Sequence, residues 1–377
     1  MDLTKESVKP NDFDLLDRQG GECVIVRSER LSRKIHPRRT AALCEEGFVI
    51  IDRDYLPASS AGAIESEQGW YISDIDADDI RRFSNLEAAP YGFETDYDVL
   101  GWACAMMTES PLGVALLTRA KHDGWKIKLS DLSTGGFLLE VPQKIIVLDH
   151  FSLKPSALGR SAFFRNALLV SMIKALRDAW HETGWDGVES HYKPEAILML
   201  ERARAADGDA AAVLAAWELR GAGYSEIWRH LIGSEDGDMA LTFMRSIERD
   251  PASLYNGLAM SRTFAQWFTD DLRVATCDHE TLEHLDALLT QDMETEFCLG
   301  DHPLDTARLE TLSKLPDGTF YLTGQGAGMV KNPDFIGVND TLNEAHLFHL
   351  IYDLQVVMVG GVPFRDARLA RKIFPPK

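Results

Sequence analysis

Three side chains that could take part in catalysis or metal binding lie along one stretch of the chain, LLVSMIKALRDAWHE (168–182). Lys174, Asp178 and His181 stand at positions i, i+4 and i+7, and a helix with about 100° between residues places them on one side. The opposite side predicts a buried apolar face, formed by Leu168, Leu169, Met172, Ile173, Leu176 and Trp180. The stretch therefore predicts an amphipathic helix that aims an ammonium, a carboxylate and an imidazole at a cleft.

Asp207 could complete a metal site together with this stripe. Asp178 and His181 are i,i+3 neighbours, and two carboxylates with one imidazole can hold a divalent ion. One hypothesis is therefore a metal-dependent hydrolase with Asp178, His181 and Asp207 as ligands and zinc or another divalent metal as cofactor. The alternative is that these acids form solvated surface, in which case we expect no cofactor.

Three short motifs and the order of elements around this helix resemble a known family. KALRDAW (174–180) stands where that family has H-E-L-R-H-A-W, DGDA (207–210) where it has E-A-D-A, and AWELR (216–220) where it has A-W-E-L. The region from about 111 to 220 is similar in this way to an uncharacterised bacterial family described as putative metallopeptidases. The resemblance implies a zincin-like fold, in which one helix supplies two histidine ligands to zinc.

The motif positions lack the residues that zinc-dependent hydrolysis requires. Lys174 stands in place of the first histidine, Ala175 in place of the glutamate and Asp178 in place of the second histidine. The acidic third ligand is replaced by another acid, Asp207. A protonated lysine repels Zn²⁺, and alanine cannot take a proton from water. The resemblance therefore implies a pseudoenzyme that has lost zinc and proteolytic activity and binds a peptide or protein.

The run KIIVL contains the candidate binding strand, Ile145, Ile146, Val147 and Leu148. The family comparison places it where a zincin has its substrate-binding edge strand, so a peptide could add to it as a further strand. If 145–148 is not such an edge, the hypothesis of an unrelated soluble α+β interaction protein gains support.

The remaining patterns predict an α+β fold, with a small mixed sheet followed by a mainly helical C-terminal half. WKIKLSDL (125–132) and FLLEV (137–141) read as strands near KIIVL. Pro111–His122 and Ser161–Thr183 read as helices, and 194–222 as one helix or a helix pair. Further helices are expected at 225–232, 236–249, 258–268 and 279–290, with a last one that Asn339 or Asp340 caps.

We divide the chain into a flexible N-terminus (1–20), an N-terminal α/β region (21–95), a metallopeptidase-like domain (96–223) and a mainly helical region (224–377). ECVIVR (22–27) and GFVIIDRDYL (47–56) are expected strands of the second part. The glycine-rich segment LTGQGAGMVKNPDF (322–335) is expected to be a loop or turn.

The overall charge bears on partners and location. The net charge is −20, so the average surface repels nucleic acid, although RSERLSRKIHPRR (27–39) is either a solvated basic stretch or an anion-binding arm. The five cysteines are widely spaced, and no run of about 18 apolar residues occurs. We therefore expect an acidic cytoplasmic protein that does not enter a membrane.

Two other clusters contain metal-capable side chains. CDHETLEHLD (277–286) pairs His279 with Glu283 and Glu280 with His284, on helix faces about 100° apart, so no single face gathers all four. EAHLFHL (344–350) places His346 and His349 at i,i+3 among leucines. Both clusters read more simply as structural or surface positions than as metal or acid/base sites.

Overall fold

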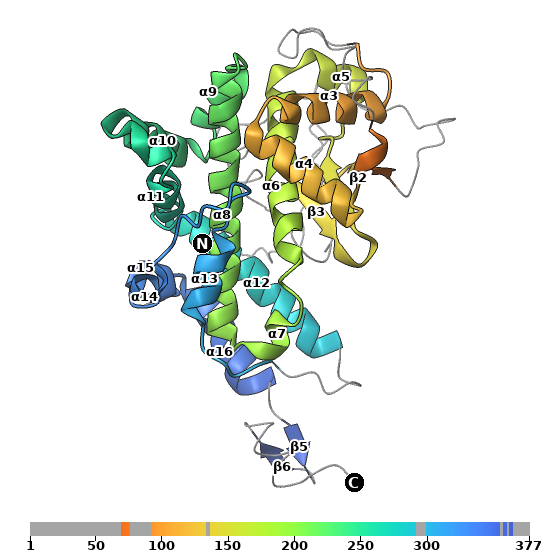
Figure 1. The fold of residues 1–377 in the computed structure, drawn as a ribbon. Coiled ribbons are helices and arrows are strands. Elements are labelled where there is room, and N and C mark those ends of the chain that lie inside the picture. Colours follow the sequence, from red (N-terminus) through yellow and green to blue (C-terminus); the bar gives the residue numbers. More distant parts are fainter. Residues whose placement is uncertain are drawn as a thin grey trace, which may run out of the picture.

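Two long helices, α6 (Ala162–Glu182) and α8 (Pro194–Gly221), run side by side through the centre of the protein (Figure 1). The computed structural model describes residues 69–75, 92–132, 136–291, 299–354, 357–359 and 362–364. A small sheet with helices α3 and α4 lies on one side of the α6–α8 pair, and α10 and α11 lie on the other. Residues 1–68, with the expected strands at 22–27 and 47–56 and the basic stretch 27–39, lie outside the described residues.

The main sheet is mixed, and the α+β prediction is confirmed. Its strand order is β1-β2-β4-β3, in which β2 and β4 are parallel and the two outer pairs are antiparallel. Phe137, Leu139, Ile146 and Leu148 belong to the main core, to which α6 also contributes, whereas Leu138, Ile145 and Val147 belong to a second, smaller cluster. The strands are β1 (Trp70–Tyr71), β2 (Lys126–Ser130), β3 (Phe137–Glu140) and β4 (Ile145–Asp149).

The prediction that 145–148 is an edge strand is wrong. Ile145, Ile146, Val147 and Leu148 belong to β4, which pairs with β2 on one side and with β3 on the other. All of β4 is buried. A strand buried on both faces has a continuous apolar run such as IIVL rather than an alternating pattern. With both edges already paired, β4 cannot accept a peptide as an added strand.

The helix predicted at Pro111–His122 is confirmed as α4, and local capping explains the limits of the helices near the sheet. The Thr95 side chain accepts a hydrogen bond from the backbone N–H of Asp98, whose carboxylate accepts one from the Thr95 N–H in return, so α3 begins with a capping box. Ser110 caps α4, which ends at Gly124 in a left-handed conformation. The helices are α3 (Asp96–Thr108), α4 (Pro111–Asp123), α5 (Pro155–Arg160) and α7 (Val188–His191).

Residues 194–221 form one helix, α8, rather than a helix pair. The many alanines of α8 favour helix, and Gly208 in its interior does not interrupt the helix. The helices after α8 include the four predicted at 225–232, 236–249, 258–268 and 279–290, of which the fourth begins earlier, at Asp271, and Asp340 is the cap of the last α-helix. They are α9 (Glu226–Ile232), α10 (Gly237–Arg249), α11 (Leu258–Trp267), α12 (Asp271–Gln291), α13 (Thr306–Leu312), α14 (Gly326–Met329), α15 (Pro333–Ile336) and α16 (Thr341–His349).

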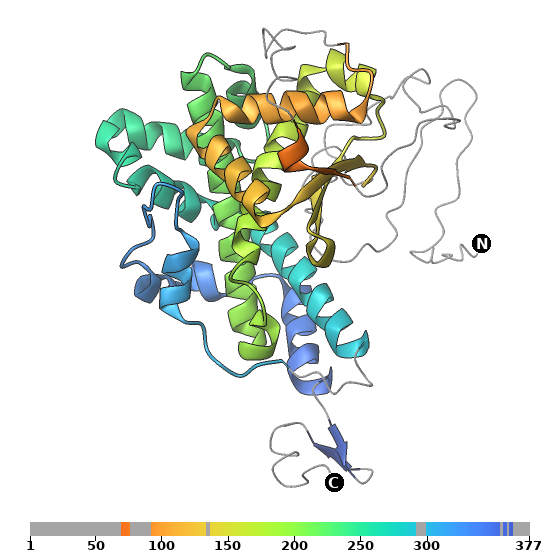
Figure 2. The same cartoon turned by 45° about the vertical axis from the view of Figure 1, so that its right-hand side comes forward.

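The C-terminal part corrects one sequence prediction. The glycine-rich segment 322–335, expected to be a loop or turn, contains turns and also the single-turn helix α14 and most of α15, which Asn332 caps through its side chain. Figure 2 shows α12 and α16 side by side at the lower end of the molecule, where they are in contact. Beyond α16 the chain continues as a π-helical turn (Leu350–Leu354) and the strand pair β5 (Val357–Val359) and β6 (Val362–Phe364).

Substitutions at two glycines test how tightly α3 and α4 pack at the corner between them. A Cβ at Gly113 would lie 2.2 Å from the carbonyl oxygen of Met107, whereas a Cβ at Gly208 would meet no atom within 4 Å. We expect Gly113→Ala to destabilise the protein by about 1–3 kcal/mol, because the α3–α4 corner must open. Gly208→Ala is the matched control and should stabilise by about 0.5–1 kcal/mol, as in any helix interior. Urea unfolding of both variants measures the difference, and equal effects would contradict the packing.

Candidate functional site: the charged interface of α6 and α8

Ionic and polar contacts join α6 to α8 along their length. As the residue number rises on α6 it falls on α8, so the two helices are antiparallel. The four pairs, in order, are Lys174–Asp209, Arg177–Asp207, Asp178–Arg204 and Trp185–Glu201, of which Trp185 lies just beyond the end of α6. The polar stripe predicted from the sequence is real, but it packs against another helix. The expectation that it faces a cleft is wrong.

Lys174 forms the first of these contacts. Its Nζ lies 2.9 Å from Oδ1 of Asp209 and 2.6 Å from Oδ2 of Asp236, which directly precedes α10. Trp267 donates from Nε1 to the other oxygen of Asp209 at 2.8 Å. The Lys174 side chain is 12% exposed, and the two carboxylates are 2% and 3% exposed. Two buried carboxylates therefore share one ammonium group at this point.

Asp207 is the centre of the second contact. Arg177 donates to both of its oxygens, at 2.5 Å from Nε and 3.1 Å from Nη2. Nε2 of His181 lies 2.7 Å from one oxygen, and the Tyr321 hydroxyl donates to the other at 2.5 Å. Arg177 also donates to the carbonyl oxygens of Leu312 and Lys314, at the end of α13. Both carboxylate oxygens of Asp207 are thus fully used by protein donors.

The electrostatics of this cluster fix its protonation states. Burial alone would raise the pKa of Asp207, but the charge of Arg177 and the hydrogen bond from His181 outweigh it and hold that pKa well below its usual range. Burial and the charge of Arg177 lower the pKa of His181. Burial and the charge of Asp207 raise the pKa of Tyr321 well above its usual value. At neutral pH the cluster therefore consists of an ion pair, a neutral imidazole and a neutral phenol.

Asp178 belongs to a separate cluster around Arg204. The guanidinium group of Arg204 donates to the Asp178 carboxylate, to the Asp178 carbonyl oxygen at 3.0 Å and to the Glu182 carboxylate. It also lies over the Trp185 ring, 4.8 Å from the centroid. Burial lowers the pKa of Arg204, but the charges of Asp178 and Glu182 outweigh it and raise that pKa. Asp178 is thus committed to an arginine and not to His181 and Asp207.

Ala175 and Glu218 complete the motif positions. Ala175 is fully buried in the main core, so the helix face at this position contacts packed side chains. Glu218, from AWELR, accepts hydrogen bonds from the Ser110 hydroxyl and, at 2.9 Å, from the backbone N–H of Leu112. It thereby ties the end of α8 to the beginning of α4.

Residues 166–323 match the model of a family described as "Putative metallopeptidase family (DUF6782)". The match covers most of α6, α8 and the helices up to α13, so this region is similar to that family, and the hypothesis of an unrelated protein is not supported for it. No curated protein and no solved structure matches the chain. Within the described residues, no helix has the length and apolar character needed to cross a bilayer.

The donor chemistry of the family region does not fit a metal ion at the motif positions. The proposed ligands Asp178, His181 and Asp207 do not form one site, because Arg204 binds the first and Arg177 binds the third. Among the described residues, no three His, Cys, Asp or Glu side chains converge in a way that could hold a metal ion. A divalent ion beside either arginine would be repelled at short range. The substituted-ligand site is therefore not supported.

Members of the two other histidine clusters make contacts between helices. Asp278, in the 277–286 cluster, accepts two hydrogen bonds from Arg202 of α8, at 2.5 and 2.6 Å. His284 lies 3.4 Å from Glu189, and His346 lies 3.4 Å from Asp286. These contacts join α12 to α8, α7 and α16.

Sequence analysis missed the arginines that organise the site. Arg177, Arg202 and Arg204 are 0%, 0% and 3% exposed, and each makes charged hydrogen bonds to buried carboxylates. The segment LERARAADGDA (200–210) could have revealed them, because its charged residues are interspersed with small alanines. Charged residues within an otherwise alanine-rich buried helix indicate internal ion pairs.

Asp207→Asn tests the central contact of the family region. The change keeps the shape but removes the charge, so Arg177 is left buried without a counter-ion. We expect a loss of about 3–5 kcal/mol in the free energy of unfolding, measured in denaturant. The control is Asp186→Asn, an exposed acid after the same helix, which should change stability by less than about 0.5 kcal/mol. A similar small effect at Asp207 would show that the ion pair is not structural.

His181 predicts a pH dependence of stability. Its pKa is lower in the folded protein than in the unfolded chain, where it is about 6.5. The unfolded chain therefore binds more protons below about pH 6.5, and stability falls as the pH drops from there towards the folded pKa. His181→Gln should lose less stability than wild type between about pH 7 and pH 5. His122→Gln, at an exposed histidine, should follow the wild-type curve.

Proposed function

We propose that this chain is a metallopeptidase-family protein that has lost zinc and proteolytic activity and acts by binding a peptide or protein. The observation that carries the proposal is the Lys174 ammonium group between the carboxylates of Asp209 and Asp236. In the zincin-like alignment, position 174 is that of the first histidine ligand. An internal cation thus stands where the resemblance implies a metal ligand, and the neighbouring carboxylates are its partners.

The remaining motif positions support the same conclusion. Ala175 has no group that could act as a general base towards water, and it is buried in the core. Asp178 and Asp207 each neutralise an arginine, so neither has a free oxygen pair to offer an incoming metal ion. Restoring one ligand alone would leave the two arginines in place. The loss of hydrolysis therefore rests on the whole interface and not on one substitution.

Binding remains the activity that such a domain could still perform. The net charge of −20 argues for a protein or peptide partner rather than nucleic acid. The internal position of β4 means that the partner must contact a surface other than residues 145–148. We also propose a cytoplasmic location, on the grounds of the widely spaced cysteines.

Metal analysis of the purified full-length protein tests the loss of zinc. We expect less than stoichiometric zinc after purification without chelators, and no cleavage of an unfolded protein substrate in zinc-supplemented buffer. Stoichiometric zinc together with chelator-sensitive cleavage would overturn the proposal. Zinc without cleavage would overturn only the part that concerns the metal.

Lys174→Ala tests whether the Lys174 ammonium group stabilises the two buried carboxylates beside it, as a bound metal ion would. The variant leaves Asp209 and Asp236 buried without it, so the melting temperature should fall, by an amount that corresponds to about 3–5 kcal/mol. Added Ca²⁺ should recover part of the loss, because an ion that binds only the folded state stabilises it. Lys193→Ala is the control, since its contact with Glu195 is exposed, and it should show neither effect. A Lys174 variant as stable as wild type would contradict the role.

A further inference from the structure

A groove of about 350 Å³ lies between α10 and α11. Each helix lines it with residues at the spacing i, i+3, i+4 and i+7, which is one face of a helix. The lining residues are Thr242, Arg245, Ser246 and Arg249 from α10, and Arg262, Ala265, Gln266 and Thr269 from α11 and its end. The two faces meet through a hydrogen bond of 3.2 Å from the Thr242 hydroxyl to Gln266. The groove is therefore a surface built jointly by both helices.

Three arginines give this groove its charge. Arg245, Arg249 and Arg262 are exposed, and within the part of the chain that the structure describes none of them makes an ion pair or a hydrogen bond. In a chain with 59 acids and 39 bases, carboxylates are plentiful, and the buried Arg177 has one. Within the described residues, the groove thus gathers three guanidinium groups that have no carboxylate partner.

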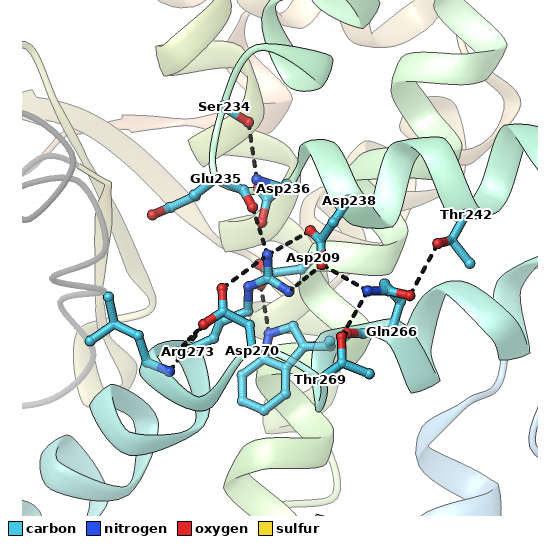
Figure 3. A network of polar contacts seen from close by, with 12 residues as sticks. Asp209, Ser234, Glu235, Asp236, Asp238, Thr242, Gln266, Thr269, Asp270 and Arg273 are labelled. Carbon is cyan, nitrogen blue, oxygen red and sulfur yellow. Dashed lines mark hydrogen bonds and ion pairs between the residues drawn. The ribbon is translucent and has the colours of Figure 1, made fainter. Parts of the chain in front are cut away.

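The polar end of the groove is held in place by a hydrogen-bond network (Figure 3). Gln266 donates from Nε2 to Asp238 at 3.1 Å and to the Thr269 hydroxyl at 2.7 Å. Asp238 in turn accepts from Arg273 at 2.7 Å, and Arg273 also donates to the carbonyl oxygen of Glu235 at 2.6 Å. The charge of Asp238 is therefore already matched by Arg273. It does not neutralise the three arginines that line the groove.

We propose that the groove lined by Arg245, Arg249 and Arg262 binds a phosphorylated ligand with at least two adjacent negative charges, such as a diphosphate group. The planar fork of a guanidinium group matches two phosphate oxygens at once. A single carboxylate carries one charge and would leave most of the positive charge unmatched, whereas a diphosphate can match all three arginines. The volume lies in the range of small-molecule sites, roughly 300–1,000 Å³. This inference is independent of the proposed loss of proteolysis.

Calorimetric titration of the full-length protein with inorganic pyrophosphate tests the site. The buffer contains no divalent ions and has low ionic strength. We expect one equivalent to bind, with an affinity that decreases as salt is added, because exposed charges are screened. Citrate and sulfate serve as comparison anions of the carboxylate and single-centre classes, and both should bind more weakly than pyrophosphate.

The variants Arg245→Gln, Arg249→Gln and Arg262→Gln should each weaken pyrophosphate binding by about tenfold or more, the value of one charge-assisted hydrogen bond. All three side chains are exposed and without partners in the described structure, so the variants should melt like wild type. Arg229→Gln is the control, because it removes the same charge from an exposed arginine of α9 outside this groove. It should leave the affinity within about twofold of wild type, since a distant exposed charge is screened.

Three results would overturn the assignment. Absence of pyrophosphate binding would remove the site. An equal weakening by Arg229→Gln and by the groove variants would mean that the anion responds only to overall charge. Tighter binding of citrate than of pyrophosphate would assign the groove to a carboxylate ligand instead.

Discussion

A guanidinium group that leaves water must find hydrogen-bond acceptors within reach, and at the centre of this protein carboxylates supply them. Arg177, Arg202 and Arg204 are all buried, and each meets an acid on a neighbouring helix. Two of the three belong to α8, and the third binds Asp207 of α8. The position of α8 against α6 and α12 is therefore fixed by charge as well as by apolar packing. Removing one partner of a buried pair costs several kcal/mol, so these contacts tolerate little change.

The same constraint explains why α6 resembles a catalytic helix without facing a cleft. A metallopeptidase helix needs one apolar face and one polar face, and α6 has both. Here the polar face meets α8, whose acids neutralise the cations of α6 directly. Buried ion pairs add little net stability compared with apolar packing, but they specify which residues must meet. The α6–α8 register is accordingly set by matched charges, such as Lys174 with Asp209 and Arg204 with Asp178.

Much of the fold could be predicted from local sequence, because caps and apolar periods act over a few residues. The helices at 111–122 and 161–183 are present as expected, Asp340 caps the last α-helix, and the runs FLLEV and KIIVL are strands. The site could not be predicted in this way. A helical wheel separates polar from apolar faces but cannot tell water from a second polar helix. The partners of Lys174 lie 35 and 62 positions further along the chain, at Asp209 and Asp236. The order of strands, which places β4 inside the sheet, is likewise a property of long-range pairing.

The shared carboxylate Asp207 has a consequence for how this chain could change. Its oxygens form hydrogen bonds with Arg177, His181 and Tyr321 together. A substitution of Asp207 that keeps the bond to one of these neighbours therefore leaves the other two without their partner. A variant with a metal ligand at this place would have to replace several mutually dependent residues at once, because each single change leaves a buried charge without its partner. The network therefore limits which substitutions the helix pair can accept one at a time.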